Sequence, residues 1–181
     1  ILYSFITMTI FLLPAFLVVT SDSLGLSKVY YSFREQSVGW YLFTYVALFF
    51  WHETYFYWAH RLMHLKIFYR PFHHVHHLSK EPTPFTAFSF HPLEAIVESG
   101  AILSLTFLIP VHVSALVLFT LFSLLFNVYG HLGIRLFEHK KGLFRYLNSP
   151  EKHALHHSRY RGNYGLYTVL WDRIMRTEIR S

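Results

Sequence analysis

Nine histidines fall into three short motifs, and their spacing is the feature of the sequence best suited to chemistry. The motifs are His60-Arg-Leu-Met-His64, His73-His74-Val-His76-His77 and His153-Ala-Leu-His156-His157. Residues three and four positions apart share one face of a helix, so the outer histidines of each motif should point the same way. Imidazole nitrogen is a common metal ligand. Eight such ligands exceed the roughly four that a tetrahedral zinc takes, and we therefore predict two metals close together.

Two histidines near the motifs have weaker signals. His74 lies about 100° around a helix from its neighbour in the motif, so we expect it behind the ligands or facing solvent. His131 follows a long uncharged stretch, where it could be a simple interfacial residue, but its position suits a ninth ligand. The remaining histidines with no partner at helical spacing are expected to be structural: His52, His112 and His139.

Glu53 is the acidic candidate because it lies seven residues before His60, on the same helical face. A buried carboxylate there could orient a ligand imidazole. The alternative is an interfacial acid paired with Arg61 or Lys66.

Composition points to a protein whose surface faces lipid as much as water. Of the 181 residues, 53% are hydrophobic and only 14% are charged, against a usual charged fraction of roughly 25%. Cysteine is absent, which excludes disulfides and thiolate metal sites. The formal charge of +6 comes from basic residues scattered among apolar runs, which favours a membrane surface over nucleic acid as the partner.

Long uncharged stretches predict the elements that must position the histidines. Ile1 to Ser21 fits one membrane pass of about 20 residues, with Pro14 as a kink. It lacks a basic n-region and a cleavage site, so we expect a spanning segment rather than a signal peptide. The chain begins without Met, which suggests a fragment. A second stretch begins at Gln36 and should continue through Trp58 into the first motif.

The stretch from Ser99 to Ile134 is far longer than one crossing needs. Pro110 lies near its middle, so we predict two short helices that turn at Pro110-Val-His112. Beyond them, Ser149-Pro150-Glu151 has the pattern of a helix start, with Ser as N-cap, Pro at the first helical position and an acid in the first turn. The third motif would begin on that helix.

These elements predict an all-α fold, namely an integral membrane, four-helix transmembrane bundle with a cytosolic helical cap that carries the histidine metal site. Fourteen of the sixteen Lys and Arg follow the second and fourth crossings, which makes that side cytoplasmic by the positive-inside rule. We divide the chain into residues 1–37, the first transmembrane helix and its connection, and residues 38–181, the catalytic domain.

With these residues in hand, the chain resembles the fatty acid hydroxylase/sterol desaturase superfamily of membrane di-iron oxidases. The resemblance covers about Tyr41 to Thr177, from Tyr57-Trp-Ala-His60 to the closing Asn163-Tyr-Gly165 and Trp171-Asp172-Arg173. Pro82-Thr-Pro84-Phe85 and Phe90-His91-Pro92 resemble the sterol desaturase (lathosterol oxidase) branch.

The resemblance implies a set of iron ligands, residues that lie behind those ligands, and external reactants. The ligands would be His60, His64, His73, His76, His77, His131, His153, His156 and His157. Glu53, His74 and Asn163 would lie behind them. Two non-haem irons, replaceable by zinc in a structure, would use dioxygen and two electrons from a separate donor, a b-type cytochrome or ferredoxin with its NAD(P)H reductase. The location would be the endoplasmic reticulum or a bacterial inner membrane.

We therefore predict an oxidoreductase that desaturates or hydroxylates a sterol-like or fatty acyl lipid. Three aromatic residues near the first motif could line the slot that binds the lipid, or could equally be packing or interfacial residues: Tyr55, Tyr57 and Trp58. One alternative is a membrane protein that binds or transports metal, which would need ligands along a pathway at mid-membrane. Another is a zinc-dependent lipid hydrolase, which would keep an open coordination position and few ligands.

Overall fold

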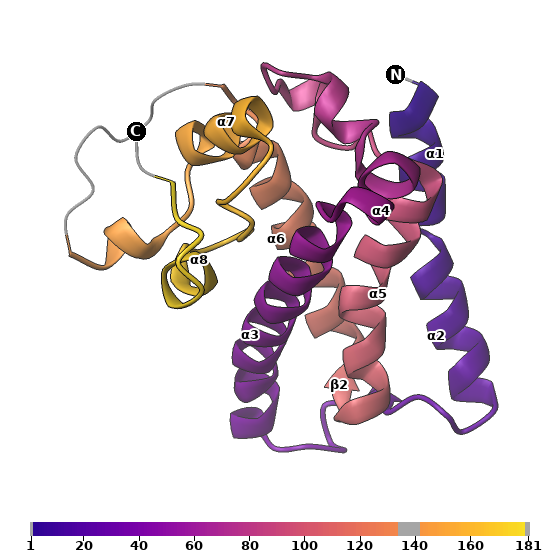
Figure 1. Cartoon of the computed structure of the whole chain (residues 1–181). Coiled ribbons are helices and arrows are strands. Elements are labelled where there is room, and N and C mark those ends of the chain that lie inside the picture. The colour runs from indigo at the N-terminus through magenta and orange to yellow at the C-terminus, as the bar shows by residue number, and fades with distance from the viewer. Residues whose placement is uncertain (1, 134–141, 180–181) are drawn as a thin grey trace.

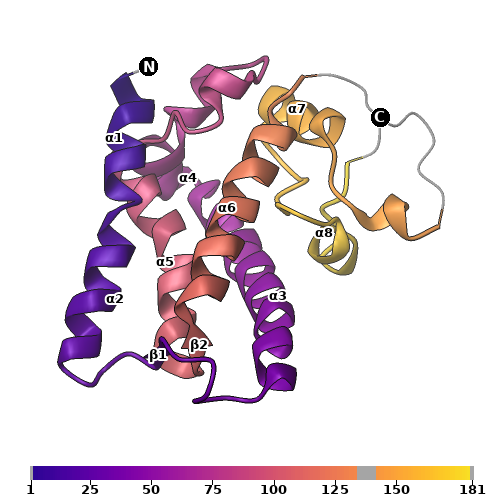
Figure 2. The ribbon, with the colours of Figure 1, turned by 180° about the vertical axis from the view of Figure 1, so that it is seen from behind.

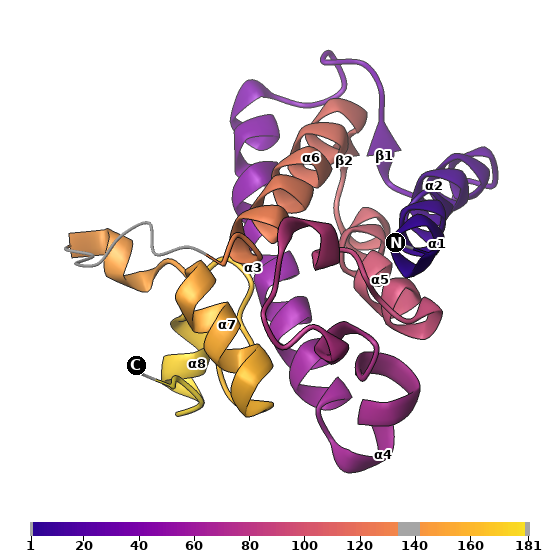
Figure 3. The ribbon, with the colours of Figure 1, turned by 90° about the horizontal axis from the view of Figure 1, so that it is seen from above.

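The computed structural model describes residues 2–133 and 142–179, and most of them are helical. Figures 1 and 2 show helical rods side by side, formed by α1 with α2, by α3, by α5 and by α6. The short segments that carry the second and third histidine motifs gather toward one end of these rods, together with the N-terminus. A small strand pair lies at the other end. Figure 3 looks down on the end that carries the histidine motifs.

The N-terminal rod consists of two helices, α1 (Leu2–Ile10) and α2 (Leu13–Ser23). The break falls just before Pro14, which has no backbone N–H to continue the helical ladder and occupies the first turn of α2. Together they form a stretch of 22 residues, apolar and long enough to cross a membrane. The single kinked helix predicted here is therefore an interrupted one.

The second rod, α3 (Val38–Met63), begins where the Ser37 hydroxyl accepts a hydrogen bond from the backbone N–H of Trp40. It runs without interruption into the first histidine motif, as the sequence predicted. Its 26 residues carry His60 in the last turn, and His64 caps the helix. Leu48 of α3 packs in the core against α5, α6 and Tyr167 of the C-terminal region.

The predicted helical pair around Pro110 is present as α5 (Pro92–Leu108) and α6 (Val113–Gly130). Between them, β2 (Val111–His112) pairs in parallel with β1 (Val29–Tyr30), so the fold is not strictly all-α. The helix α5 starts seven residues earlier than the uncharged stretch, because Pro92 suits a first helical position and the acid Glu94 suits a first turn.

The other described elements are short, and most of them lie near the histidine motifs. They are α4 (Lys66–Phe68), the π-helical turn η1 (Tyr69–His73), the 3-10 turns η2 (His76–Leu78), η3 (Pro84–Thr86) and η4 (Gly142–Tyr146), and the helices α7 (Pro150–Arg159) and α8 (Leu170–Ile174). The helix α7 has Ser149 as its N-cap, which confirms the predicted helix start.

By length and composition, two segments of the described chain could cross a membrane, Leu2–Ser23 and Val113–Gly130. The helices α3 and α5 do not meet the same measure of length and apolarity. The predicted four crossings and the assignment of one end to the cytoplasm therefore stay predictions.

Candidate metal centre

The nine predicted ligands converge into two groups of side-chain nitrogens, each group able to hold a metal ion. Within each group the candidate ligand atoms lie within 4.8 Å of one another. We call them centre A, formed by His60, His64, His73, His77 and His156, and centre B, formed by His76, His131, His153 and His157.

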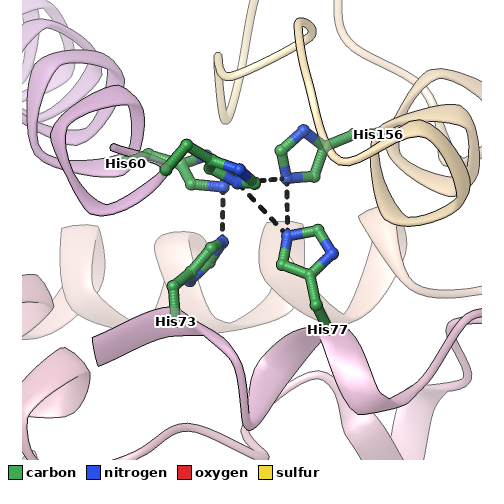
Figure 4. A group of neighbouring side chains, drawn as sticks. His60, His73, His77 and His156 are labelled. Carbon is green, nitrogen blue, oxygen red and sulfur yellow. Dashed lines mark hydrogen bonds between the residues drawn. The ribbon is translucent and has the colours of Figure 1, made fainter. Parts of the chain in front are cut away.

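Centre A draws its histidines from three elements that surround one point, with α3 on one side, α7 opposite and the η1–η2 segment between them (Figure 4). The Nε2 atoms of His60 and His73 are 2.9 Å apart. The Nε2 atom of His156 lies 3.1 Å from that of His77 and 3.1 Å from that of His64. The rings therefore present their Nε2 atoms to a common centre.

Centre B is built in the same way from the end of α6, from η2 and from α7. The Nε2 atom of His131 lies 2.9 Å from that of His153 and 3.4 Å from that of His76. His157 completes the group, with its Nε2 atom 3.0 Å from that of His153. His131, predicted as a ninth ligand, is buried in this group at the C-terminal end of α6.

The outer nitrogens of five of these rings are held by oxygen acceptors. The Nδ1 atoms of His60, His156, His157 and His131 lie 2.7 to 2.9 Å from the carbonyl oxygens of Tyr164, Gly162, Ser79 and Asn127, and that of His73 lies 2.6 Å from Glu94 Oε1. A neutral imidazole that donates Nδ1–H keeps its lone pair on Nε2. Such outer partners fix the ring orientation of metal ligands.

These residues fit metal ions at both centres. His60 and His73 each donate from Nδ1, so as neutral rings both Nε2 atoms carry lone pairs and cannot hydrogen-bond to each other across 2.9 Å. A cation between them satisfies both. Metal–nitrogen bonds of about 2.0–2.1 Å would separate neighbouring ligands by roughly 2.9–3.4 Å. The Nε2 separations between the neighbouring rings described above fall in that interval.

The surroundings keep these rings in the neutral, ligating form. Burial lowers the pKa of His131 to about 4 and, together with the neighbouring His131, lowers that of His157 to about 3. Burial and the neighbouring imidazoles hold the pKa of His76 and of His153 well below its usual value. Metal binding requires deprotonated ligands, so both centres have ligands ready at neutral pH.

The acid next to a ligand is Glu94, which the sequence analysis did not select. Its side chain and that of His73 are almost fully buried. The signal that could have found it was the helix start at Pro92, which places an acid in the first turn of α5, at the end of that helix that contacts the second histidine motif.

The described hydrogen bonds of Glu53 join it to Tyr167 and Thr168 rather than to a ligand imidazole, Arg61 or Lys66. Its carboxylate accepts hydrogen bonds from the backbone N–H groups of Tyr167 and Thr168 and from the Thr168 hydroxyl. Asp172 of α8 does the same for the N–H groups of Tyr164 and Gly165. These two buried acids anchor the loop whose carbonyl groups receive the Nδ1–H of His60 and His156.

Asn163 also acts on the backbone. Its side chain donates to the carbonyl oxygens of Lys152 and Ile179 and accepts from the N–H of Ile179, so it ties the C-terminal segment to α7. His74 is exposed and packs against Tyr69.

The histidines expected to be structural are placed as follows. The ring of His52 packs against Phe119 and Tyr167. His112 caps α6, and its Nε2 atom lies 3.1 Å from the carbonyl oxygen of Tyr31. His139 lies outside the described residues.

An apolar cavity of about 450 Å³ lies between α3, α5 and the segment around Phe68 and Phe72. Tyr55 and Trp58 line it, as does Leu62, which lies two residues after His60 and so about 200° around α3. The cavity is also lined by Met63 and Phe72, which directly precede the ligands His64 and His73 in the chain. Tyr57, the third aromatic residue considered for a slot, stacks on Trp171 instead.

The fold and the site together define the class of this protein: it is a mostly helical protein with two polyhistidine centres. Residues 45–177 match the family model for fatty acid hydroxylase, and the chain belongs to that family. No solved structure matches the chain.

Two curated relatives of the chain are named as sterol-modifying enzymes. The chain is 31% identical over 172 residues to a Delta(7)-sterol 5(6)-desaturase of Leptosphaeria maculans, covering 94% of the chain and 46% of that protein. It is 33% identical over 153 residues to the lathosterol oxidase of Mus musculus, covering 83% of the chain and 50% of that protein. The chain thus spans about half the length of these relatives.

Proposed function

We propose that this chain forms the metal-binding core of a membrane oxidase that uses dioxygen and two electrons to desaturate or hydroxylate a lipid C–H bond. The observation that carries the proposal is the convergence of nine imidazoles, all buried or half-buried, on two adjacent centres, with five outer nitrogens held by oxygen acceptors. The names of the relatives favour a sterol as the lipid.

Two irons bound at centres A and B would supply the redox chemistry that attack on an unactivated C–H bond needs and that side chains alone lack. Desaturation removes two hydrogen atoms from adjacent carbons and, with two external electrons and two protons, reduces one dioxygen to two waters. Hydroxylation consumes the same electrons and protons, inserts one oxygen atom and releases one water. A separate reductase chain is the proposed electron source.

The protein's own contribution is orientation and exclusion of water. Five ligand rings are held at Nδ1, which fixes the tautomer that leaves Nε2 free. The exposed fraction of His156 and of His157 is 0%, so bulk water is kept from the rings. Both centres lie toward one end of the helical rods (Figure 1), which suits a substrate that resides in the bilayer.

The alternatives fit this arrangement less well. A transporter needs ligands along a path through the membrane, whereas here all nine rings gather in one place. A zinc hydrolase keeps few protein ligands and an open position. Five histidines at centre A oversupply such a site.

The test is metal analysis of the purified full protein, joined to an assay with lathosterol or a long-chain acyl lipid, a reductant and dioxygen. We expect two irons per chain and lipid-dependent dioxygen uptake. Mass spectrometry should find a product that has lost two hydrogens or gained one oxygen. Full activity with redox-silent zinc would refute the proposal.

A further inference from the structure

The contact between Glu94 and His73 distinguishes centre A from centre B. Glu94 Oε1 lies 2.6 Å from His73 Nδ1, and the side-chain exposures are 1% and 2%. In the part of the chain that the structure describes, this is the one contact between a histidine ring and a carboxylate. The other four outer nitrogens with oxygen partners meet neutral backbone carbonyls.

The position of Glu94 is suited to a carboxylate that serves a ring. It lies in the first turn of α5, where the N-terminal end of the helix favours negative charge. Its second oxygen, Oε2, is buried and has no hydrogen-bond partner among the described residues. A buried acid with one oxygen unpaired is costly, and the 2.6 Å contact with His73 offsets part of that cost.

We propose that Glu94 is a positioning residue that acts through His73 and makes centre A the tighter of the two metal sites. This inference rests on the proposed metal centres. A carboxylate behind a ligand imidazole fixes the tautomer and increases the electron-donating strength of the ring, and removing such a partner typically lowers metal affinity about 10–100-fold. Centre B has four histidines and no described carboxylate partner, so it should hold its metal less tightly.

The experiment uses Co²⁺ as a spectroscopic probe on the full metal-free protein. Co²⁺ affinity at each centre is measured by competition with a chelator, and the visible d–d spectrum reports the ligand set. Glu94→Gln keeps the shape and an acceptor oxygen but removes the charge. Glu98→Gln, one turn further along α5, is the matched control because it makes the same substitution on the same helix at a residue that contacts no ligand in the described structure.

We expect two Co²⁺ per chain in the wild type, with unequal affinities. Glu94→Gln should weaken the tighter site about 10–100-fold and alter its spectrum, while the weaker site and Glu98→Gln stay as in the wild type. In a His73→Ala background, Glu94→Gln should cause no further loss, since Glu94 acts through that ring.

Three results would overturn the inference. The first is a Glu94→Gln variant whose tighter site keeps its Co²⁺ affinity while only the melting temperature falls. The others are a loss of Co²⁺ affinity as large as that in Glu94→Gln when the same substitution is made in the His73→Ala background, or when Glu98→Gln is made instead. If Glu94→Gln does not fold, Glu94→Asp keeps the charge and should retain most of the tight-site affinity; a loss as large as that in His73→Ala would contradict the role. Failure of the wild type to bind two Co²⁺ would instead contradict the metal centres themselves.

Discussion

His153 and His156 lie one turn apart on the same face of α7, with stacked rings 5.8 Å apart, yet they belong to different centres. His156 faces His64 and His77 of centre A, whereas His153 faces His131 of centre B. One face of α7 thus contributes ligands to both centres. The ligands of the second motif and those of the third are each divided between centre A and centre B.

This division predicts that single histidine variants remove one metal each. His156→Ala should lose the metal of centre A and His153→Ala that of centre B, so each should retain about one metal per chain and lose turnover. Metal content per chain and dioxygen uptake measure this. The matched control is His74→Ala, because His74 is exposed in the same motif as three ligands; this variant should keep both metals and full activity. Retained turnover in His156→Ala would contradict the assignment.

Glu53 should matter more for stability than for metal affinity. Glu53→Ala removes an acceptor of three hydrogen bonds and leaves the buried N–H groups of Tyr167 and Thr168 unpaired. We expect a loss of about 2–4 kcal/mol in the free energy of unfolding. Denaturant or thermal unfolding of the metal-free protein measures the free energy of unfolding, and competition with a chelator measures the metal affinity. A variant of normal stability that lost one metal would instead support the ligand-orienting role considered from the sequence.

Gly165 is required by close packing between the two anchoring acids. A Cβ there would overlap the carbonyl oxygen of Thr168 and lie 3.1 Å from Asp172 Oδ2. Gly165→Ala should therefore shift the loop that positions the Tyr164 carbonyl behind His60, with about 1–3 kcal/mol of lost stability and weaker metal binding at centre A. Gly39→Ala is the control, since its Cβ would make only an ordinary contact in the first turn of α3. Equal melting temperatures for the two variants would refute this.

The C-terminal segment should be held to α7 by a pH-dependent ion cluster. Burial alone would raise the pKa of Glu178, but Lys152 and Arg173 bind its carboxylate and hold the pKa below its usual 4.5. A lowered folded-state pKa gives stability that is present above the unfolded value and lost as pH falls through the folded one.

Glu178→Gln should consequently melt below the wild type at pH 7, and the difference should shrink as pH falls below about 4.5. Melting curves of the two proteins across that range measure the difference. A gap that stays constant with pH would show that the charge of Glu178 does not carry the effect.

Much of the local structure was determined by the sequence alone. The capping pattern at Ser149-Pro150-Glu151 starts α7 where expected, and Pro110 separates α5 from α6 because proline cannot continue a helix. The spacing of the histidines predicted two metals, and the nine predicted ligands, which include His131 and not His74, form two groups able to hold them. These features depend on neighbours within a few residues.

Only the tertiary structure decided which histidine serves which centre and which acid stands behind a ligand. Helical spacing places His153 and His156 on one face but cannot say that α3 meets one ring and α6 the other. Glu53 shares the face of His60 but is drawn to the backbone of Tyr167, more than a hundred residues away, whereas Glu94 reaches His73 from another helix. Such partners are set by packing between distant segments, which local patterns do not encode.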